Sequence, residues 1–226
     1  DESLTVDFSN GNPLPFAGID LLGTGSADSD SLNLTGGSAT DIDHVLDSEV
    51  DGSVTVDGRR VSYTSIENLS DLMDSASRSI EFADNTSAVN VSDSGSSSDG
   101  LSTTNRDGFG TVIPVRLGSG DLSFTTGFRD NIIQFQSVDA AFTGKVNIDA
   151  GDGNDFVDVM LLSSDNTIIA GKGNDTVFSG SGNDTINGGM GFDSVFSGDG
   201  DDLIFGGGGR DTLKGGDGDD LINGNA

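Results

Sequence analysis

The sequence contains no cysteine and no tryptophan, and its 10 Lys and Arg residues face 38 Asp and Glu residues, giving a formal charge of −28. Without cysteine, the disulfide bonds that hold many small extracellular domains together are excluded. The negative charge excludes nucleic acid and anionic membrane surfaces as partners. No apolar run approaches the roughly 20 residues needed to cross a bilayer, so we expect no membrane insertion.

The chain begins at Asp1 without a basic and apolar leader, which leads us to expect a mature form or a fragment. Glycine is abundant, with 35 residues. A glycine-rich chain that repels itself usually stays disordered, because it buries too little apolar surface to offset its conformational entropy. Folding therefore requires something that neutralises the charge.

A nine-residue repeat occupies the chain from residue 150 onward. Six units follow one another without a gap from Ala170: AGKGNDTVF, SGSGNDTIN, GGMGFDSVF, SGDGDDLIF, GGGGRDTLK and GGDGDDLIN. AGDGNDFVD at residues 150–158 is a seventh copy, and LLSSDNTII at residues 161–169 is a degenerate eighth. In the eighth copy Leu161 and Leu162 replace the glycines, and Asn166 replaces the aspartate.

Each unit reads small-Gly-x-Gly-x-Asp followed by three strand-like residues with an aliphatic centre. Glycine permits the positive φ angles of a tight turn, and successive strand residues face opposite sides. Each unit therefore predicts one turn and one short strand, and two units make one coil. Parallel strands of successive coils should stack ~4.8 Å apart.

Stacking places the sixth-position aspartates in columns along the turns. These residues are Asp155, Asp175, Asp184, Asp193, Asp202, Asp211 and Asp220. Like charges ~5 Å apart repel by about 1 kcal/mol in water and about 3 kcal/mol at an effective dielectric constant of 20. Calcium relieves this repulsion, because it takes six to eight oxygen ligands and the turns offer carboxylates, amide oxygens and backbone carbonyls. With no thiol and a single imidazole, His44, zinc and copper are not expected.

These units resemble the RTX nonapeptide, Gly-Gly-x-Gly-x-Asp-x-aliphatic-x, a calcium-binding β-helix repeat. The resemblance implies an all-β fold, a right-handed parallel β-roll or β-solenoid, with about five calcium ions between the turns of alternate repeats. It also implies that even positions of one turn and odd positions of the other supply ligands. Fifth-position residues then join the site: Asn154, Asn174, Asn183, Asp201 and Asp219. The turn glycines join it through their backbone: Gly151, Gly153, Gly171, Gly173, Gly180, Gly182, Gly189, Gly191, Gly198, Gly200, Gly207, Gly209, Gly216 and Gly218.

Two fifth-position residues, Phe192 and Arg210, break this pattern, and both fall in the column of Asp175, Asp193 and Asp211. The sequence therefore predicts that the site between the repeats starting at residues 188 and 206 is the weakest internal site. The column of Asp184, Asp202 and Asp220 should be the strongest.

In residues 1–108, polar and apolar residues alternate in short segments, which predicts a strand-rich amino-terminal region. We expect this region to be either a solenoid or a β-sandwich. Residues 109–149 are expected to be irregular solenoid coils that lead into the β-roll of residues 150–226. Asp57 and Gly58 predict a hairpin turn. Residues 67–77 are expected to form one or two helical turns, and residues 91–108 are expected to form a flexible loop.

Asp41, Asp43 and His44 are a candidate metal-binding group, although a surface loop explains them better. Neither Gly-x-Ser-x-Gly nor His-Glu-x-x-His occurs, and we expect no enzyme.

The repeats also carry outward apolar side chains. Phe178 and Phe196 should stack on the outer face of one sheet, with Leu203, Phe205 and Leu221 on the other. Such stripes either mark an interface or pack over the turn edges.

GTGSADSDSLNLTGG and VTVDGRRVSYTSIENL resemble the strand-rich repeats that precede RTX runs in large bacterial surface proteins. The resemblance implies a secreted structural module of an adhesin, surface layer or fibre, which calcium folds outside the cell. Its partners would be calcium and either further copies or other cell-surface components. The alternatives are the calcium-dependent secretion tail of a toxin or hydrolase, and a self-assembling extracellular filament.

Overall fold

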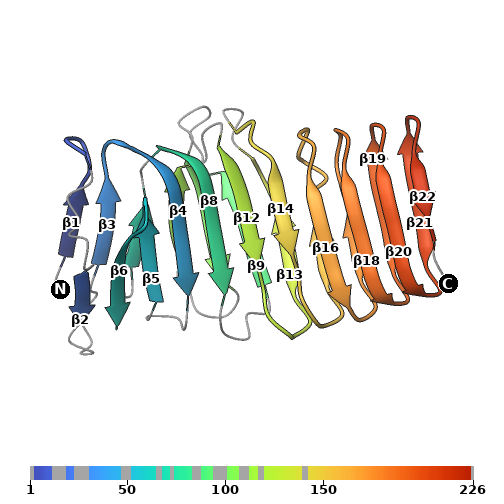
Figure 1. Ribbon diagram of the computed structural model, residues 1–226, viewed down its shortest axis with the longest axis horizontal. Helices are drawn as coiled ribbons and strands as arrows, with labels where there is room; N and C mark the ends of the chain where they lie inside the picture. Colours follow the sequence, from blue (N-terminus) through green and yellow to red (C-terminus); the bar gives the residue numbers. More distant parts are fainter. Residues whose placement is uncertain are drawn as a thin grey trace.

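The computed structural model describes residues 3–11, 19–22, 31–46, 52–64, 68–71, 74–82, 88–93, 101–106, 112–116, 120–138 and 142–224. Its described elements are all β-strands, which form two facing sheets along one elongated body (Figure 1). The amino and carboxyl termini lie at opposite ends of this body. No helix in the described ranges is long and apolar enough to span a membrane.

Each sheet contains 11 strands, and strands adjacent in the order are hydrogen-bonded. The first sheet runs β1 (Ser3–Asp7), β3 (Ser31–Thr35), β7 (Asn68–Asp71), β11 (Val112–Arg116), β10 (Leu101–Arg106), β9 (Ala88–Asp93), β13 (Ile132–Phe135), β15 (Phe156–Asp158), β17 (Thr176–Phe178), β19 (Ser194–Asp199) and β21 (Thr212–Asp217). The second sheet runs β2 (Ile19–Leu22), β6 (Arg59–Thr64), β5 (Gly52–Val56), β4 (Ser38–Leu46), β8 (Asp74–Phe82), β12 (Asp121–Thr125), β14 (Val146–Asp149), β16 (Thr167–Lys172), β18 (Thr185–Gly191), β20 (Leu203–Gly209) and β22 (Leu221–Asn223).

From β12 onward the chain alternates between the sheets, and each strand pairs in parallel with the strand one coil later. In the repeats, Ile168 pairs with Ile186 and Ile186 with Ile204, which is the 18-residue coil that the sequence predicts. The parallel β-solenoid is therefore confirmed. It begins upstream of the recognisable repeats, because β12 already pairs with β14 and β13 with β15.

The amino-terminal strands belong to the same two sheets, with two antiparallel excursions. β4, β5 and β6 form one, and β9, β10 and β11 form the other. Parallel pairs β1–β3, β3–β7 and β4–β8 continue the coil pattern, so the pairing matches the solenoid rather than a separate sandwich. The division of the chain at residues 108 and 149 stays a prediction.

One local prediction is confirmed and three are wrong. The β5–β6 hairpin turns at Asp57 and Gly58, whose φ angles are 48° and 74°, as expected. Residues 67–77, expected to be helical, contain β7 and the start of β8, because pairing with β3 and β4 overrides the local pattern. Of residues 91–108, expected to be a loop, the described ones form the end of β9 and all of β10, which pair with each other, and residues 94–100 and 107–108 lie outside the described part of the chain. The segment of His44 is not a surface loop but part of β4.

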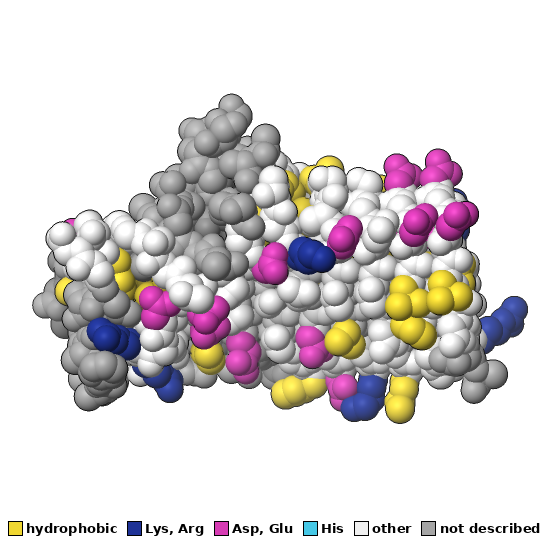
Figure 2. All heavy atoms as spheres, turned by 45° about the horizontal axis from the view of Figure 1, so that its top comes forward, with side chains coloured by type: hydrophobic (Ala, Val, Ile, Leu, Met, Phe, Trp, Pro, Cys, Tyr) yellow, Lys and Arg dark blue, Asp and Glu magenta, His cyan; other side chains and the backbone are white. Residues whose placement is uncertain are grey.

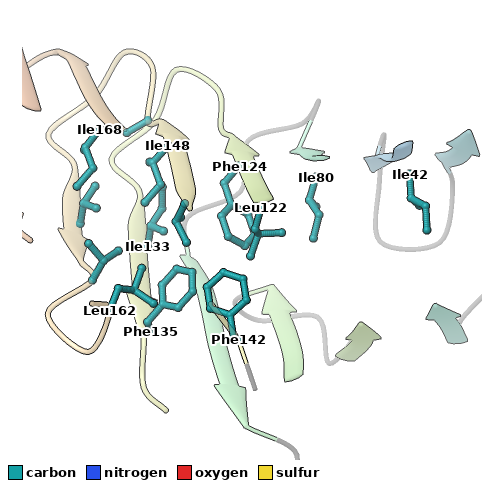
Figure 3. Close-up of a cluster of buried hydrophobic side chains, with 14 of the residues drawn as sticks. Ile42, Ile80, Leu122, Phe124, Ile133, Phe135, Phe142, Ile148, Leu162 and Ile168 are labelled. Atoms are coloured by element: carbon teal, nitrogen blue, oxygen red, sulfur yellow. The ribbon is translucent and has the colours of Figure 1, made fainter. Parts of the chain in front are cut away.

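The core consists of the inward side chains of both sheets, enclosed between them (Figure 3). In the second sheet, His44 pairs with Ile80, Ile80 with Phe124, Phe124 with Ile148 and Ile148 with Ile168. All five side chains are buried. One continuous row of inward residues therefore joins the amino-terminal strands to the repeats.

The burial of His44 removes the candidate metal-binding group in β4. Alternation along the strand places exposed Asp41 and Asp43 on the opposite face from His44. There the two carboxylates accept hydrogen bonds from the hydroxyls of Ser77 and Ser79. These three residues therefore cannot form a metal site.

The outer faces carry the apolar side chains that the sequence predicts. Phe178 and Phe196 stack on the first sheet, with ring centroids 5.1 Å apart and planes at 11°. On the second sheet Leu203 pairs in register with Leu221, and Phe205 lies two residues after Leu203 in β20. Figure 2 shows hydrophobic side chains gathered near the carboxyl-terminal end of the visible face.

Stacking of the turns predicts opposite outcomes for two adjacent glycines. Gly207 has φ = +98°, and a Cβ atom there would lie 1.9 Å from the carbonyl oxygen of Gly189, whereas a Cβ atom at Gly208 would meet nothing within 4 Å. Gly207→Ala should lower the unfolding free energy of the calcium-loaded protein by about 2 kcal/mol or more, from φ strain and the clash. Gly208→Ala should leave it nearly unchanged. Thermal unfolding followed by circular dichroism compares the two variants, and equal melting temperatures would contradict the stacked-turn geometry.

Candidate metal-binding turns

The repeat turns form two columns on opposite edges of the solenoid (Figure 1). Turns of the first column lead from second-sheet strands to first-sheet strands, and turns of the second column lead back. The first column comprises residues 126–131, 150–155, 170–175, 188–193 and 206–211, and the second comprises residues 161–166, 179–184, 197–202 and 215–220.

Sixth-position side chains form a hydrogen-bonded ladder in the first column. Oδ1 of Asp175 accepts a hydrogen bond from the backbone N–H of Asp155 at 2.7 Å, and Oδ1 of Asp193 accepts from Asp175 at 2.9 Å. Oδ1 of Asp211 accepts from the N–H of Asp193 at 3.0 Å. Each carboxylate therefore reaches back to the preceding coil and stacks on the next carboxylate.

The second column has the same ladder. Oδ1 of Asp202 accepts from the N–H of Asp184 at 2.8 Å, and Oδ1 of Asp220 accepts from Asp202 at 3.1 Å. The columns of sixth-position aspartates that the sequence predicts are therefore present on both edges.

Among the residues that the structure describes, the second oxygen of most of these carboxylates has no hydrogen-bond partner. Oδ2 is buried without a hydrogen bond in Asp155, Asp175, Asp193, Asp202 and Asp211. Asp184 differs, because the hydroxyl of Ser179 donates to its Oδ2. A buried carboxylate oxygen without a donor is costly unless an ion balances it. These residues therefore fit a cation that binds oxygen.

Burial of these carboxyl groups raises their pKa values. Burial brings the pKa of Asp155 to about 6 and that of Asp175 to about 7, with neighbouring carboxylates adding to the shift. Burial also raises the pKa values of Asp184 and Asp193 above the ordinary value. When no other cation is bound, these buried carboxyl groups therefore take up protons more readily than exposed ones.

Turn glycines bring backbone carbonyls into the same columns. A Cβ atom at Gly189 would lie 1.9 Å from the carbonyl oxygen of Gly171, and one at Gly191 would lie 1.6 Å from that of Gly173. Gly189 and Gly191 also have positive φ angles, +104° and +142°, which residues with a Cβ atom rarely adopt, so both positions require glycine. The carbonyls of positions two and four thus lie directly against the next turn.

Fifth-position side chains form a second ladder in the opposite direction. In the second column, Oδ1 of Asn183 accepts from the N–H of Asp201 at 2.9 Å, and Oδ1 of Asp201 accepts from Asp219 at 2.8 Å. In the first column, Oδ1 of Asn174 accepts from the N–H of Phe192 at 2.8 Å. The ladder ends there, because Phe192 has no side-chain oxygen to offer the next turn. The two columns are therefore unequal in their oxygen atoms, while the ranking of their affinities stays a prediction.

The candidate ligands offer oxygen atoms alone. Among the described residues, no group of three or more His, Cys, Asp or Glu side chains gathers as a ready-made metal site. An ion between two turns therefore needs backbone carbonyls beside the aspartates, which is the mixture of ligands that calcium takes.

The predicted aspartates differ in their place along the columns. Five of them are followed by another aspartate turn: Asp155, Asp175, Asp184, Asp193 and Asp202. Asp211 and Asp220 lie in the last turns of their columns. Four of the five, all except Asp184, combine a following aspartate turn with an Oδ2 atom that has no hydrogen-bond donor among the described residues.

Sequence reasoning missed one turn, at residues 126–131. This turn takes the place of a repeat turn ahead of residues 150–155, because Oδ1 of Asp130 accepts from the N–H of Asn154 at 2.7 Å. The N–H of Asn131 completes the stacking by donating to Oδ1 of the sixth-position aspartate in the next turn, also at 2.7 Å.

The signal for this turn is present in the sequence as TGFRDNIIQ, with Gly127 in position two and Ile133 in position eight. Arg129 stands in place of the fourth-position glycine, and the turn is stacked on a partner 24 residues later. Both departures hide it from a search for a regular nine-residue period.

Comparison with known families decides the identity of the later turns. The family model described as RTX calcium-binding nonapeptide repeat, with 4 copies, matches residues 162–195 and 196–226. Residues 162–226 are RTX calcium-binding nonapeptide repeats. This RTX segment is less than a third of the chain, and such repeats are characteristic of secreted bacterial proteins. No curated protein and no solved structure is significantly similar to the chain.

The raised pKa values predict how the turns respond to pH. A carboxyl group whose folded pKa exceeds its unfolded pKa stabilises the fold below the unfolded value, and this contribution is lost as the pH rises through the folded value. Calcium-free protein should therefore gain β-structure as the pH falls from about 8 to about 5, because Asp155 and Asp175 take up protons. Calcium competes with these protons, so its affinity should fall over the same range. Circular dichroism and calcium titration at several pH values measure both effects, and a pH-independent affinity would contradict the assignment of these carboxylates as ligands.

The broken fifth-position ladder predicts a paired set of substitutions. Phe192→Asn supplies an acceptor for the N–H of Arg210 and a ligand oxygen, which should strengthen the site between residues 188–193 and 206–211 about fivefold. Asn183→Phe should weaken the corresponding site of the second column by a similar factor. Calorimetric titration at low calcium measures the occupancy of the weakest class of sites. Unchanged titrations for both variants would show that the fifth position does not rank the sites.

Proposed function

We propose that this chain is a calcium-dependent extracellular structural module, part of a cell-surface adhesin, surface layer or fibre. Its RTX segment folds when it meets calcium outside the cell. The observation that carries this proposal is a set of buried Oδ2 atoms that have no donor in the described ranges, in Asp155, Asp175, Asp193, Asp202 and Asp211.

A compartment switch follows from the energetics of these columns. Without calcium at neutral pH, stacked carboxylates repel one another inside a poorly solvated turn, and the coils lose stability. A site formed only by folding converts the free energy of metal binding into folding free energy. Extracellular calcium modules bind calcium at about 10⁻⁴ to 10⁻³ M, so they fill outside the cell and stay empty in the cytosol.

A structural role is supported by the shape and by the sequence. The two sheets form an elongated body, which suits a spacer or a fibre element (Figure 1). The sequence lacks the motifs of common hydrolases and has one histidine. We therefore regard the chain as non-catalytic, with calcium and other cell-surface components as its partners.

Titration with calcium after chelation tests the proposal. Far-ultraviolet circular dichroism should show a coil-to-β change with a midpoint between about 10⁻⁴ and 10⁻³ M calcium. Magnesium at the same concentration is the control, and it should fail, because it demands small octahedral sites and keeps its water. A spectrum unchanged by calcium, or an equal response to magnesium, would contradict the proposal.

A further inference from the structure

Each column of turns begins with asparagine instead of aspartate in the sixth position. Asn131 stands in the first turn of the first column, and Asn166 stands in the first turn of the second. Both side chains are buried, at 2% exposure each. Both turns stack on an aspartate turn of the following coil, because their N–H groups donate to Oδ1 of Asp155 and Asp184 at 2.7 Å.

The amide nitrogen of Asn131 collects oxygen atoms from two successive turns. It donates to the carbonyl of Arg129, in position four of its own turn, and to the carbonyl of Ala150 at 3.2 Å, in position one of the next. It also donates to Oδ1 of Asp155 at 3.0 Å, in position six of the next turn. Three oxygens from two coils thus surround one hydrogen-bond donor.

Asn166 repeats this arrangement in the second column. Its Nδ2 donates to the carbonyl of Ser164 at 2.7 Å, again in position four, and to Oδ1 of Asp184 at 3.1 Å, again in position six of the next turn. Its Oδ1 accepts from the N–H of Val146 at 3.1 Å, as Oδ1 of each aspartate accepts from the preceding coil. Oδ1 of Asn131 has no such donor among the described residues. In both turns the amide nitrogen is the counterpart of the aspartate Oδ2.

In the aspartate turns, the carboxylate Oδ2, a hydrogen-bond acceptor, takes the place of the amide nitrogen, a hydrogen-bond donor, of the asparagine turns. An amide carries two N–H bonds in that position, whereas an ionised carboxylate carries none. The two amide nitrogens each have at least two partners. Within the described part of the chain, the buried Oδ2 atoms without a partner belong to Asp155, Asp175, Asp193, Asp202 and Asp211. Where this Oδ2 has no donor, a cation is needed between two aspartate turns, whereas the amide itself joins an asparagine turn to the next one.

We propose that Asn131 and Asn166 exclude calcium from the first turn pair of each column and hold that pair together in its place. The inference rests on the proposed function, in which the aspartate turns bind calcium. The coils of residues 120–138 and 142–169 then stay assembled without calcium. These coils present a preformed strand edge to the aspartate coils. Adding a coil to an existing edge avoids the loss of conformational entropy that forming a first coil requires.

The conversion of one amide to a carboxylate, made in the whole 226-residue chain, tests this inference. Asn131→Asp changes the donor to an acceptor at nearly constant shape. Calorimetric titration should show one additional calcium ion per chain, and hydrogen exchange of the calcium-free protein should show lost protection in β13. Asn166→Asp should likewise add one calcium ion, and the calcium-free protein should lose hydrogen-exchange protection in β14 and β16. Asn131→Ala is the matched control, which should lose the calcium-free protection without gaining an ion.

The reverse substitution sharpens the test. Asp155→Asn places an amide beside the existing asparagine turn, so the protein should bind one calcium ion fewer and gain calcium-free protection in β15 and β17. If wild-type protein binds calcium but Asn131→Asp changes neither the number of ions nor the exchange of calcium-free protein, the inference is wrong and the proposed function stands. If wild-type protein binds no calcium, the proposed function itself fails.

Discussion

The structure depends on the stacking of aspartate carboxylates, one coil upon the next, along the two edges of a solenoid. Each carboxylate uses Oδ1 to hold the backbone of the preceding coil, so it cannot turn away into solvent. Where its Oδ2 is buried without a donor, only a proton or a cation can balance it. The same contact that aligns the coils thus makes their stability conditional on an ion. Calcium is the ion that the oxygen-only set of side chains and the RTX repeats indicate.

The glycine content follows from this constraint. Turns at the spacing of β-strands leave no room for a Cβ atom at positions such as Gly189, where the carbonyl of the preceding turn approaches the backbone. The core is correspondingly thin, because most repeats contribute one aliphatic side chain of the strand, such as Val177, beside a small first-position residue, such as Ala170. So small a core per coil contributes little stability by itself. Upstream, the larger side chains of Phe124 and Phe135 meet inside the solenoid, in the coil whose turn carries an asparagine in the sixth position.

The sequence predicted the regular part of this molecule and missed its irregular part. A period of nine residues with aspartate and aliphatic side chains in register defines both the turns and the strands, since local chemistry and stacking agree there. The helix expected at residues 67–77 failed because its strands are specified by pairing with distant strands, which leaves no local signal. His44 lies in a segment whose alternation of polar and apolar residues indicates a strand, but a buried histidine was not expected. Asn131 was missed because Arg129 and a longer coil break the repeat that would reveal it.

The most direct test of the central claim is a crystal structure of the calcium-loaded protein with the anomalous signal of the metal. We predict calcium between successive aspartate turns, about 2.3 to 2.6 Å from the Oδ2 atoms that lack a donor. No metal should lie beside the amide nitrogens of Asn131 and Asn166. Aspartate turns stacked in the same way without calcium between them, in protein saturated with the ion, would contradict the central claim.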